Sequence, residues 1–86
     1  MALSIVGLGA GDISQISHGA MELLKSGRPV YLRTEKHPIV DLLDIGYRSF
    51  DQYYDSKEDF EQVYESIARE LINLARDTDI VYAVPG

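Results

Sequence analysis

The segment Gly7-Leu8-Gly9-Ala10-Gly11-Asp12 ends a short apolar stretch that begins at Leu3 and is typical of a β-strand. Glycines at alternate positions let the backbone leave a strand sharply and bring bare N–H groups close to a ligand. Such a loop at the carboxyl end of a parallel strand is the usual place for a nucleotide-like cofactor. A dinucleotide fingerprint would need its third glycine where this chain has Asp12. The segment therefore predicts either a cofactor loop of another kind or a plain strand-to-helix turn.

Apolar strand patterns alternate with helical ones along the 86 residues, and few turn dipeptides are available for hairpins. We therefore predict an α/β fold with a parallel sheet and flanking helices. The expected strands are residues 4–8, 30–32 and 80–84, with a short fourth strand within 47–50. The expected helices are residues 17–26, 38–45 and 57–76, and residues 51–55 are expected to form a loop that exposes Tyr53 and Tyr54.

The caps and faces of two helices can also be predicted. Ser17 is expected to cap the first helix, with Gly27 as its left-handed end. Ser56, with Asp59 three residues later, resembles a capping box for the long helix. Its inner face is expected to be apolar, and its acidic residues are expected to form a solvated face rather than a catalytic cluster. The expected inner residues are Phe60, Val63, Tyr64, Ile67, Ala68, Leu71, Ile72, Leu74 and Ala75.

Charge and composition exclude several classes of function. The net charge of −6 arises in residues 51–86, which carry nine acidic and three basic side chains. This acidity disfavours binding to nucleic acid. The absence of cysteine excludes disulfides and thiolate metal sites, and the two histidines have no partners at metal-ligand spacing. No stretch resembles a signal peptide or is long enough to cross a membrane, so we expect a cytoplasmic protein without a membrane partner.

The carboxyl ends of parallel strands share one edge of a sheet, so this edge is the candidate site. It should gather the glycine loop, the segment Arg33-Thr34-Glu35-Lys36-His37, and Pro85-Gly86. Arg33 or Lys36 can pair with a carboxylate or phosphate, and Glu35 or His37 can handle a proton. An ordinary polar loop, with His37 as a helix cap, explains the same charged cluster.

Three stretches of the chain together resemble the tetrapyrrole (corrin/porphyrin) methylase family: Val6-Gly7-Leu8-Gly9-Ala10-Gly11-Asp12, Val30-Tyr31-Leu32-Arg33-Thr34-Glu35-Lys36-His37-Pro38, and Val81-Tyr82-Ala83-Val84-Pro85-Gly86. The glycine loop is weakly specific by itself, whereas the other two stretches together are fairly specific. The chain is similar above all to the branch in which such a domain precedes a MazG-type nucleotide pyrophosphohydrolase domain.

The resemblance implies a methyltransferase fold of two α/β domains, with S-adenosylmethionine held in the cleft between them and a porphyrin-like or corrin-like methyl acceptor. It implies cofactor binding by Gly7, Gly9, Ala10, Gly11, Pro85 and Gly86. From their place at the same edge, Arg33, Thr34, Glu35 and His37 are expected to bind the substrate. No catalytic residue and no metal ligand can be assigned. Relatives often have proline at position 10, and those that form precorrin or sirohaem carry an aspartate at position 32, where this chain has Leu32. Because leucine cannot accept a proton, the acceptor is left open.

Residues 1–86 are therefore expected to be the first part of a methylase-like domain, cut at Gly86 from a longer chain that continues into a MazG-type domain. The leading hypothesis is a methyltransferase domain acting on a small molecule. A ligand-sensing module that regulates an attached pyrophosphohydrolase is the alternative, and a nicotinamide-dinucleotide domain is a weaker third. A homodimer is left open.

Overall fold

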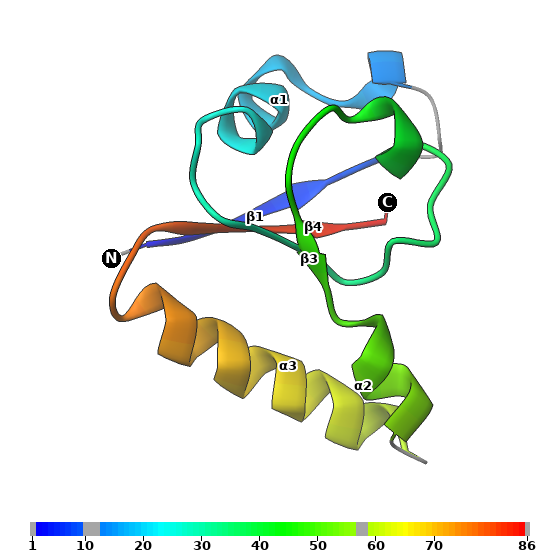
Figure 1. The fold of residues 1–86 in the computed structure, drawn as a ribbon, viewed down its shortest axis with the longest axis vertical. Helices are drawn as coiled ribbons and strands as arrows, with labels where there is room; N and C mark the ends of the chain where they lie inside the picture. Colours follow the sequence, from blue (N-terminus) through cyan, green and yellow to red (C-terminus); the bar gives the residue numbers. More distant parts are fainter. Residues whose placement is uncertain (1, 10–12, 57–58, 86) are drawn as a thin grey trace.

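The computed structural model describes residues 2–9, 13–56 and 59–85. Their strands are β1 (Leu3–Gly7), β2 (Val30–Leu32), β3 (Arg48–Ser49) and β4 (Ile80–Val84). All neighbouring strands pair in parallel, in the order β1-β4-β2-β3 (Figure 1). The predicted α/β class and parallel sheet are confirmed. The last strand in the sequence lies at the centre of the sheet, between the first and the second.

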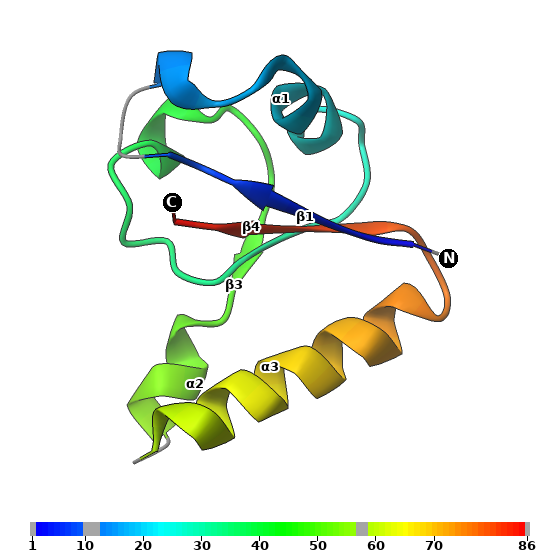
Figure 2. The same cartoon turned by 180° about the vertical axis from the view of Figure 1, so that it is seen from behind.

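The side chains of β4 alternate between two apolar layers, as the pleat of a strand requires. Val81 and Ala83 face the layer that also contains α1 (His18–Leu24) and the single-turn helices η1 (Ile13–Gln15) and η2 (Val40–Leu42). Ile80 and Tyr82 face the layer formed with α2 (Asp51–Ser56) and α3 (Phe60–Ala75). Figures 1 and 2 show α1 on one side of the sheet and α3 on the other. β4 is therefore covered on both faces, which explains its continuous apolar sequence.

The predicted ends of α1 are largely confirmed. The Ser17 hydroxyl accepts a hydrogen bond from the Ala20 amide at 3.1 Å and caps the helix. The helix ends at Leu24, two residues before the expected end, and Gly27 follows with a φ of +88°. This left-handed conformation favours glycine and turns the chain toward β2.

Residues 38–45 contain only one turn of 3-10 helix, η2, so the longer helix expected there is wrong. The adjacent residues Ile39 and Val40 are both buried, as is Leu43, whereas Leu42 is exposed. These buried side chains fill the layer under α1 from a single turn. They do not recur at the spacing of an amphipathic helix, so nothing favours a longer helix here.

The expected loop at residues 51–55 is also wrong, because these residues begin α2. Tyr53 and Tyr54 are half-buried rather than exposed. The Tyr53 ring packs edge-on against Phe50, with centroids 5.2 Å apart. Burial of these rings stabilises a short helix that has no periodic apolar pattern of its own.

The N-cap of the long helix α3 lies three residues later than predicted. Asp59 is its N-cap, and its carboxylate accepts a hydrogen bond from the Glu61 amide at 2.9 Å. Ser56 instead closes α2, and residues 57–58 of the expected helix lie outside the described residues. Aspartate caps a helix as well as serine does, so α3 can begin directly after Asp59.

The apolar stripe of α3 is wider than the sheet can cover. Val63, Ile67 and Leu71 are buried, as predicted, but four other residues of the expected inner face are exposed: Phe60, Tyr64, Ala68 and Ile72. Among the described residues, no helix combines the length and apolar character needed to cross a membrane.

Candidate functional site

Backbone hydrogen bonds bring the carboxyl ends of the strands to one edge, as predicted. The Leu8 amide donates to the Val84 carbonyl oxygen at 2.8 Å, and the Arg33 amide donates to the Ala83 carbonyl oxygen at 3.0 Å. The start of the glycine loop, the residues before Pro85 and the start of the charged segment are thus adjacent. This is the edge at which parallel α/β sheets bind their ligands.

Gly9 adopts a φ of +75°, a conformation that side chains rarely tolerate. A Cβ atom at this position would lie 3.1 Å from the Cβ of Gln15 and 3.3 Å from its Oε1. The turn between β1 and η1 therefore requires glycine here for its own geometry. The predicted role of Gly9 in cofactor binding stays a prediction, and Ala10, Gly11 and Gly86 lie outside the described residues.

His37 joins the charged segment to the glycine loop. Its Nδ1 accepts a hydrogen bond from the Ile39 amide at 3.2 Å, so the ring proton belongs to Nε2. Nε2 then donates to the Gly9 carbonyl oxygen, 3.0 Å away. The N-cap of η2 is Ile39 rather than His37, but Nδ1 of His37 accepts a hydrogen bond from the amide of that residue, and Nε2 holds the loop. Two of the three predicted segments are therefore directly connected.

Thr34 and Glu35 are held by Asp51, a residue that the sequence reasoning missed. The Thr34 hydroxyl donates to Oδ1 of Asp51 at 2.6 Å, and the Glu35 amide donates to Oδ2 at 2.8 Å. The Lys36 amide in turn donates to the Thr34 hydroxyl at 3.0 Å. The segment after β2 is thus fixed to the first residue of α2. A strand was predicted within residues 47–50, and recognition of a helix directly after it would have placed Asp51 at the same edge.

The hydrogen bonds to Asp51 favour its charged form. Burial alone would raise the pKa of this carboxyl, but hydrogen bonds from the Glu35 amide and from the hydroxyls of Thr34 and Ser49 hold it below the ordinary value. Nearby, the Tyr47 hydroxyl donates to Oε2 of Glu35 at 3.4 Å. Glu35 is therefore oriented from both its backbone and its side chain.

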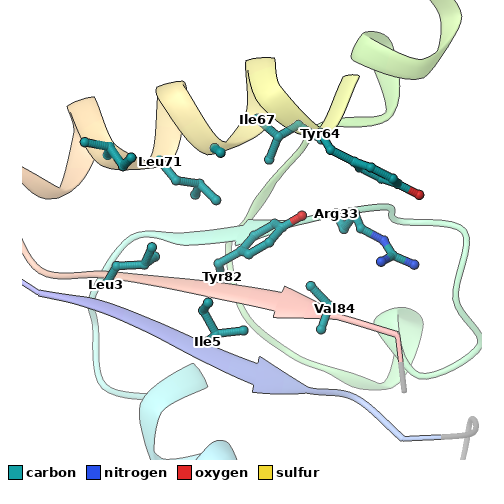
Figure 3. Close-up of a pocket in the computed structure, with 10 residues that line it drawn as sticks. Leu3, Ile5, Arg33, Tyr64, Ile67, Leu71, Tyr82 and Val84 are labelled. Atoms are coloured by element: carbon teal, nitrogen blue, oxygen red, sulfur yellow. The ribbon is translucent and has the colours of Figure 1, made fainter. Parts of the chain in front are cut away.

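Arg33 does not join His37 at the glycine loop. Its side chain lines an apolar groove on the α3 side of the sheet, together with Tyr64 and Tyr82 (Figure 3). Burial raises the pKa of Tyr82 to about 12, with the Tyr54 hydroxyl adding to this effect and the Arg33 guanidinium opposing it. The predicted substrate residues are therefore divided between two places, with Arg33 in the groove and His37 at the loop.

Leu32 is a core residue. Its side chain is 0% exposed and packs in the layer under α1. A carboxylate with that orientation would be buried among apolar side chains, which is costly without a partner. The structure thus accommodates leucine at this position and offers no acceptor of a proton there.

Two comparisons with known proteins bear on this arrangement. The sequence profile of a family described as Tetrapyrrole (Corrin/Porphyrin) Methylases matches residues 2–86. The chain is also 44% identical over 87 residues to "Uncharacterized protein YabN" of Bacillus subtilis (strain 168), a match that covers 98% of this chain and 18% of that protein. The chain thus spans about a fifth of the length of this relative. Because the family profile matches almost every residue, the chain belongs to the tetrapyrrole (corrin/porphyrin) methylase family.

Proposed function

We propose that the carboxyl edge of this sheet forms one wall of a binding site for S-adenosylmethionine in a methyltransferase. Members of the family use this cofactor as methyl donor. The observation that carries the proposal is the hydrogen bond between His37 and Gly9, which joins the glycine loop to the charged segment at this edge. In the proposed site, residues 7–11 and 85–86 contact the cofactor, and residues 33–37 contribute to the methyl acceptor site.

The residues present suit one wall of such a site. S-adenosylmethionine has an amino-acid part, a ribose and an adenine, which backbone groups and small polar side chains can bind. The edge offers backbone from Gly7, Gly9 and Pro85, with Thr34 and Glu35 fixed beside them by Asp51. A single edge cannot enclose a ligand of this size. We therefore propose that a second α/β unit, in a chain longer than this one, closes the site.

The acceptor is proposed to differ from those of the relatives that carry an aspartate at position 32. Leu32 is fully buried and cannot take part in proton removal. Methyl transfer to a good nucleophile needs chiefly the alignment of donor and acceptor, which the ordered segment after β2 can help to provide. A small-molecule acceptor is proposed on this ground.

The same observation at Leu32 favours a second candidate function. Without a proton acceptor at this position, the domain can bind S-adenosylmethionine without transferring its methyl group. In that case it would act as a sensor that regulates an attached domain, for which a MazG-type pyrophosphohydrolase is our proposal.

Calorimetric titration of a longer chain with S-adenosylmethionine, followed by a methyl-transfer assay with porphyrin-like acceptors, separates these functions. Binding together with turnover supports the methyltransferase, whereas binding without turnover, combined with a change in pyrophosphohydrolase activity, supports the sensor. Absence of binding contradicts both. The 86-residue chain by itself is expected to bind poorly, because an open half-site leaves much of the ligand in water. Micromolar affinity of this chain would contradict the two-domain cleft.

A further inference from the structure

The side chain of Arg33 lies among tyrosine rings. It is half-buried and lines the groove on the α3 side of the sheet, and Figure 3 shows it between Tyr64 and Tyr82. Burial raises the pKa of Tyr54, and the guanidinium of Arg33 opposes this effect. Within the part of the chain that the structure describes, no carboxylate forms an ion pair with Arg33. A half-buried cation that the chain does not itself neutralise can bind an anion from outside.

Three phenol groups accompany this cation. Burial, followed by the nearby hydroxyls of Tyr54 and Tyr64, raises the pKa of Tyr82 to about 12, which shows that these hydroxyls are close to one another. Neutral phenols can donate their O–H protons to an anionic oxygen. A guanidinium with neighbouring hydroxyl donors suits a carboxylate or a phosphate group. We call the four side chains of Arg33, Tyr54, Tyr64 and Tyr82 the Arg33 site.

Exposed aromatic rings continue from the Arg33 site along the first turns of α3. The rings of Tyr54, Phe60 and Tyr64 contact one another in pairs, with centroids 6.2 to 6.4 Å apart. Phe60 is 68% exposed and Tyr64 is 51% exposed, so both offer ring surface to a ligand. Aromatic rings pack favourably against other aromatic rings. The surroundings of Arg33 therefore suit a molecule that joins an anionic group to a flat aromatic body.

Acidic side chains limit how many negative charges such a molecule can carry. Asp59, Glu61 and Glu65 line the surface of α3 beside Tyr64. A second anionic group on the ligand would lie near these carboxylates and would be repelled. Arg33 is the only basic residue among the described ones that line the groove. A macrocycle with many carboxylates therefore fits this surface poorly.

We propose that the Arg33 site binds an aromatic molecule that carries one carboxylate or phosphate group. The anionic group pairs with the guanidinium of Arg33, and the aromatic ring packs against Tyr64. Arg33 follows β2 at the carboxyl edge of the sheet, where its amide is bonded to Ala83 of β4, so the ligand lies beside the proposed cofactor site. The assignment of this molecule as the methyl acceptor rests on the proposed function, whereas its binding does not require S-adenosylmethionine.

Calorimetric titration of a longer chain, without S-adenosylmethionine, tests the proposal with four probes. Naphthoate carries one carboxylate on a flat ring system, naphthyl phosphate carries a phosphate instead, naphthamide is uncharged, and uroporphyrin carries many carboxylates. At least one of the two naphthyl anions should bind about ten times or more as tightly as naphthamide, because a charge-assisted hydrogen bond contributes this much. The tighter of the two identifies the anionic group. Uroporphyrin should bind no more tightly than naphthamide.

Substitutions show whether the probe binds at the Arg33 site. Arg33→Gln removes the charge and should weaken binding of the tighter anion by about ten-fold, with no change for naphthamide. Tyr64→Leu removes a ring and should weaken binding of both compounds. Arg69→Gln is the matched control, because Arg69 is exposed on α3 and does not line the groove. This control should bind every probe as the parent does, and circular dichroism reports on folding in all three variants.

Absence of binding by both anions, or affinities no greater than that of naphthamide, would overturn the proposal. Equal affinities of folded Arg33→Gln and Arg69→Gln for the tighter anion would overturn it as well. Tight binding of uroporphyrin that depends on Arg33 would contradict the limit to one charge. Binding of S-adenosylmethionine is measured in a separate titration, so failure of the Arg33 site and failure of the proposed cofactor site are distinguishable.

Discussion

The Nε2 atom of His37 donates a hydrogen bond to the carbonyl oxygen of Gly9, 3.0 Å away, across 28 positions of sequence. The same ring accepts the Ile39 amide at Nδ1. One neutral imidazole thus fixes both the glycine turn after β1 and the 3-10 turn after β2. Its two hydrogen bonds require one tautomer, because Nδ1 must remain free of a proton to accept.

The tautomer of His37 can be measured directly. Nitrogen-15 NMR is expected to show a neutral ring with its proton on Nε2. His37→Ala removes the acceptor of the Ile39 amide, so hydrogen exchange of this amide should accelerate by about three- to ten-fold. His18→Ala is the matched control, because His18 is exposed and pairs with Glu22 on α1. A proton on Nδ1, or equal exchange in the two variants, would contradict this role of His37.

Gly9→Ala should destabilise the protein by about 1–3 kcal/mol, because it places a side chain at a positive φ and in tight contact with Gln15. Gly19→Ala provides the control within α1. A Cβ there meets no atom within 4 Å, so this variant should gain about 0.5–1 kcal/mol from the helix propensity of alanine. Urea unfolding measures both changes. If both variants shift stability in the same direction, the strained turn at Gly9 is refuted.

Asp51→Asn should lower stability at neutral pH by about 1–2 kcal/mol, because it weakens charge-assisted hydrogen bonds to Thr34 and Glu35. The folded state lowers the pKa of Asp51 below its ordinary value of 3.8, so its stabilisation is present above that pH. The stabilisation disappears as the pH falls through the lowered pKa. Unfolding curves at pH 7 and pH 2.5 should therefore differ less in Asp51→Asn than in the parent.

Asp44→Asn is the control for that measurement, since Asp44 is exposed. It should change stability by no more than about 0.5 kcal/mol at either pH. An identical pH dependence in Asp51→Asn and the parent would show that this carboxylate does not hold the segment after β2.

Tyr82 gives the opposite pH dependence. Burial raises its pKa to about 12, so the folded state favours the neutral phenol. The resulting stabilisation is complete below about pH 10, the value for an unfolded tyrosine. It is lost as the pH rises from about 10 to 12, by an amount on the order of 1–2 kcal/mol. Tyr82→Phe should not show this part of the loss of stability at alkaline pH. If the stability of the variant fell with pH as steeply as that of the parent, this role of Tyr82 would be contradicted.

The elements that could be predicted from the sequence are those whose own residues determine their structure. β4 is apolar at every position, and α1 carries a serine cap and a glycine end, so both could be recognised locally. α2 could not be recognised locally, because residues outside the helix stabilise it. These are Phe50, which lies directly before it, and the segment after β2, which is distant in the sequence. The start of α3 was ambiguous because Ser56 and Asp59 can both act as caps.

The location of the candidate site could be predicted from the sequence, but only some of its residues could. The rule for parallel strands placed the glycine loop and residues 33–37 at one edge, and the bond between His37 and Gly9 confirms that they meet. The rule does not say to which face of the sheet a side chain turns. Arg33 follows the alternation of β2 and turns to the α3 face, away from His37. Asp51 was missed together with the helix that it begins.

Equilibrium dialysis of a longer chain, comparing His37→Ala with Gly19→Ala, is the most direct test of the proposed binding of S-adenosylmethionine at this edge. Release of the glycine loop in His37→Ala should weaken binding by about ten-fold or more, whereas Gly19→Ala, on the exposed side of α1, should bind as the parent does. Circular dichroism and the melting temperature report on folding in both variants. Equal affinity of folded His37→Ala and the parent would contradict a cofactor site at this edge.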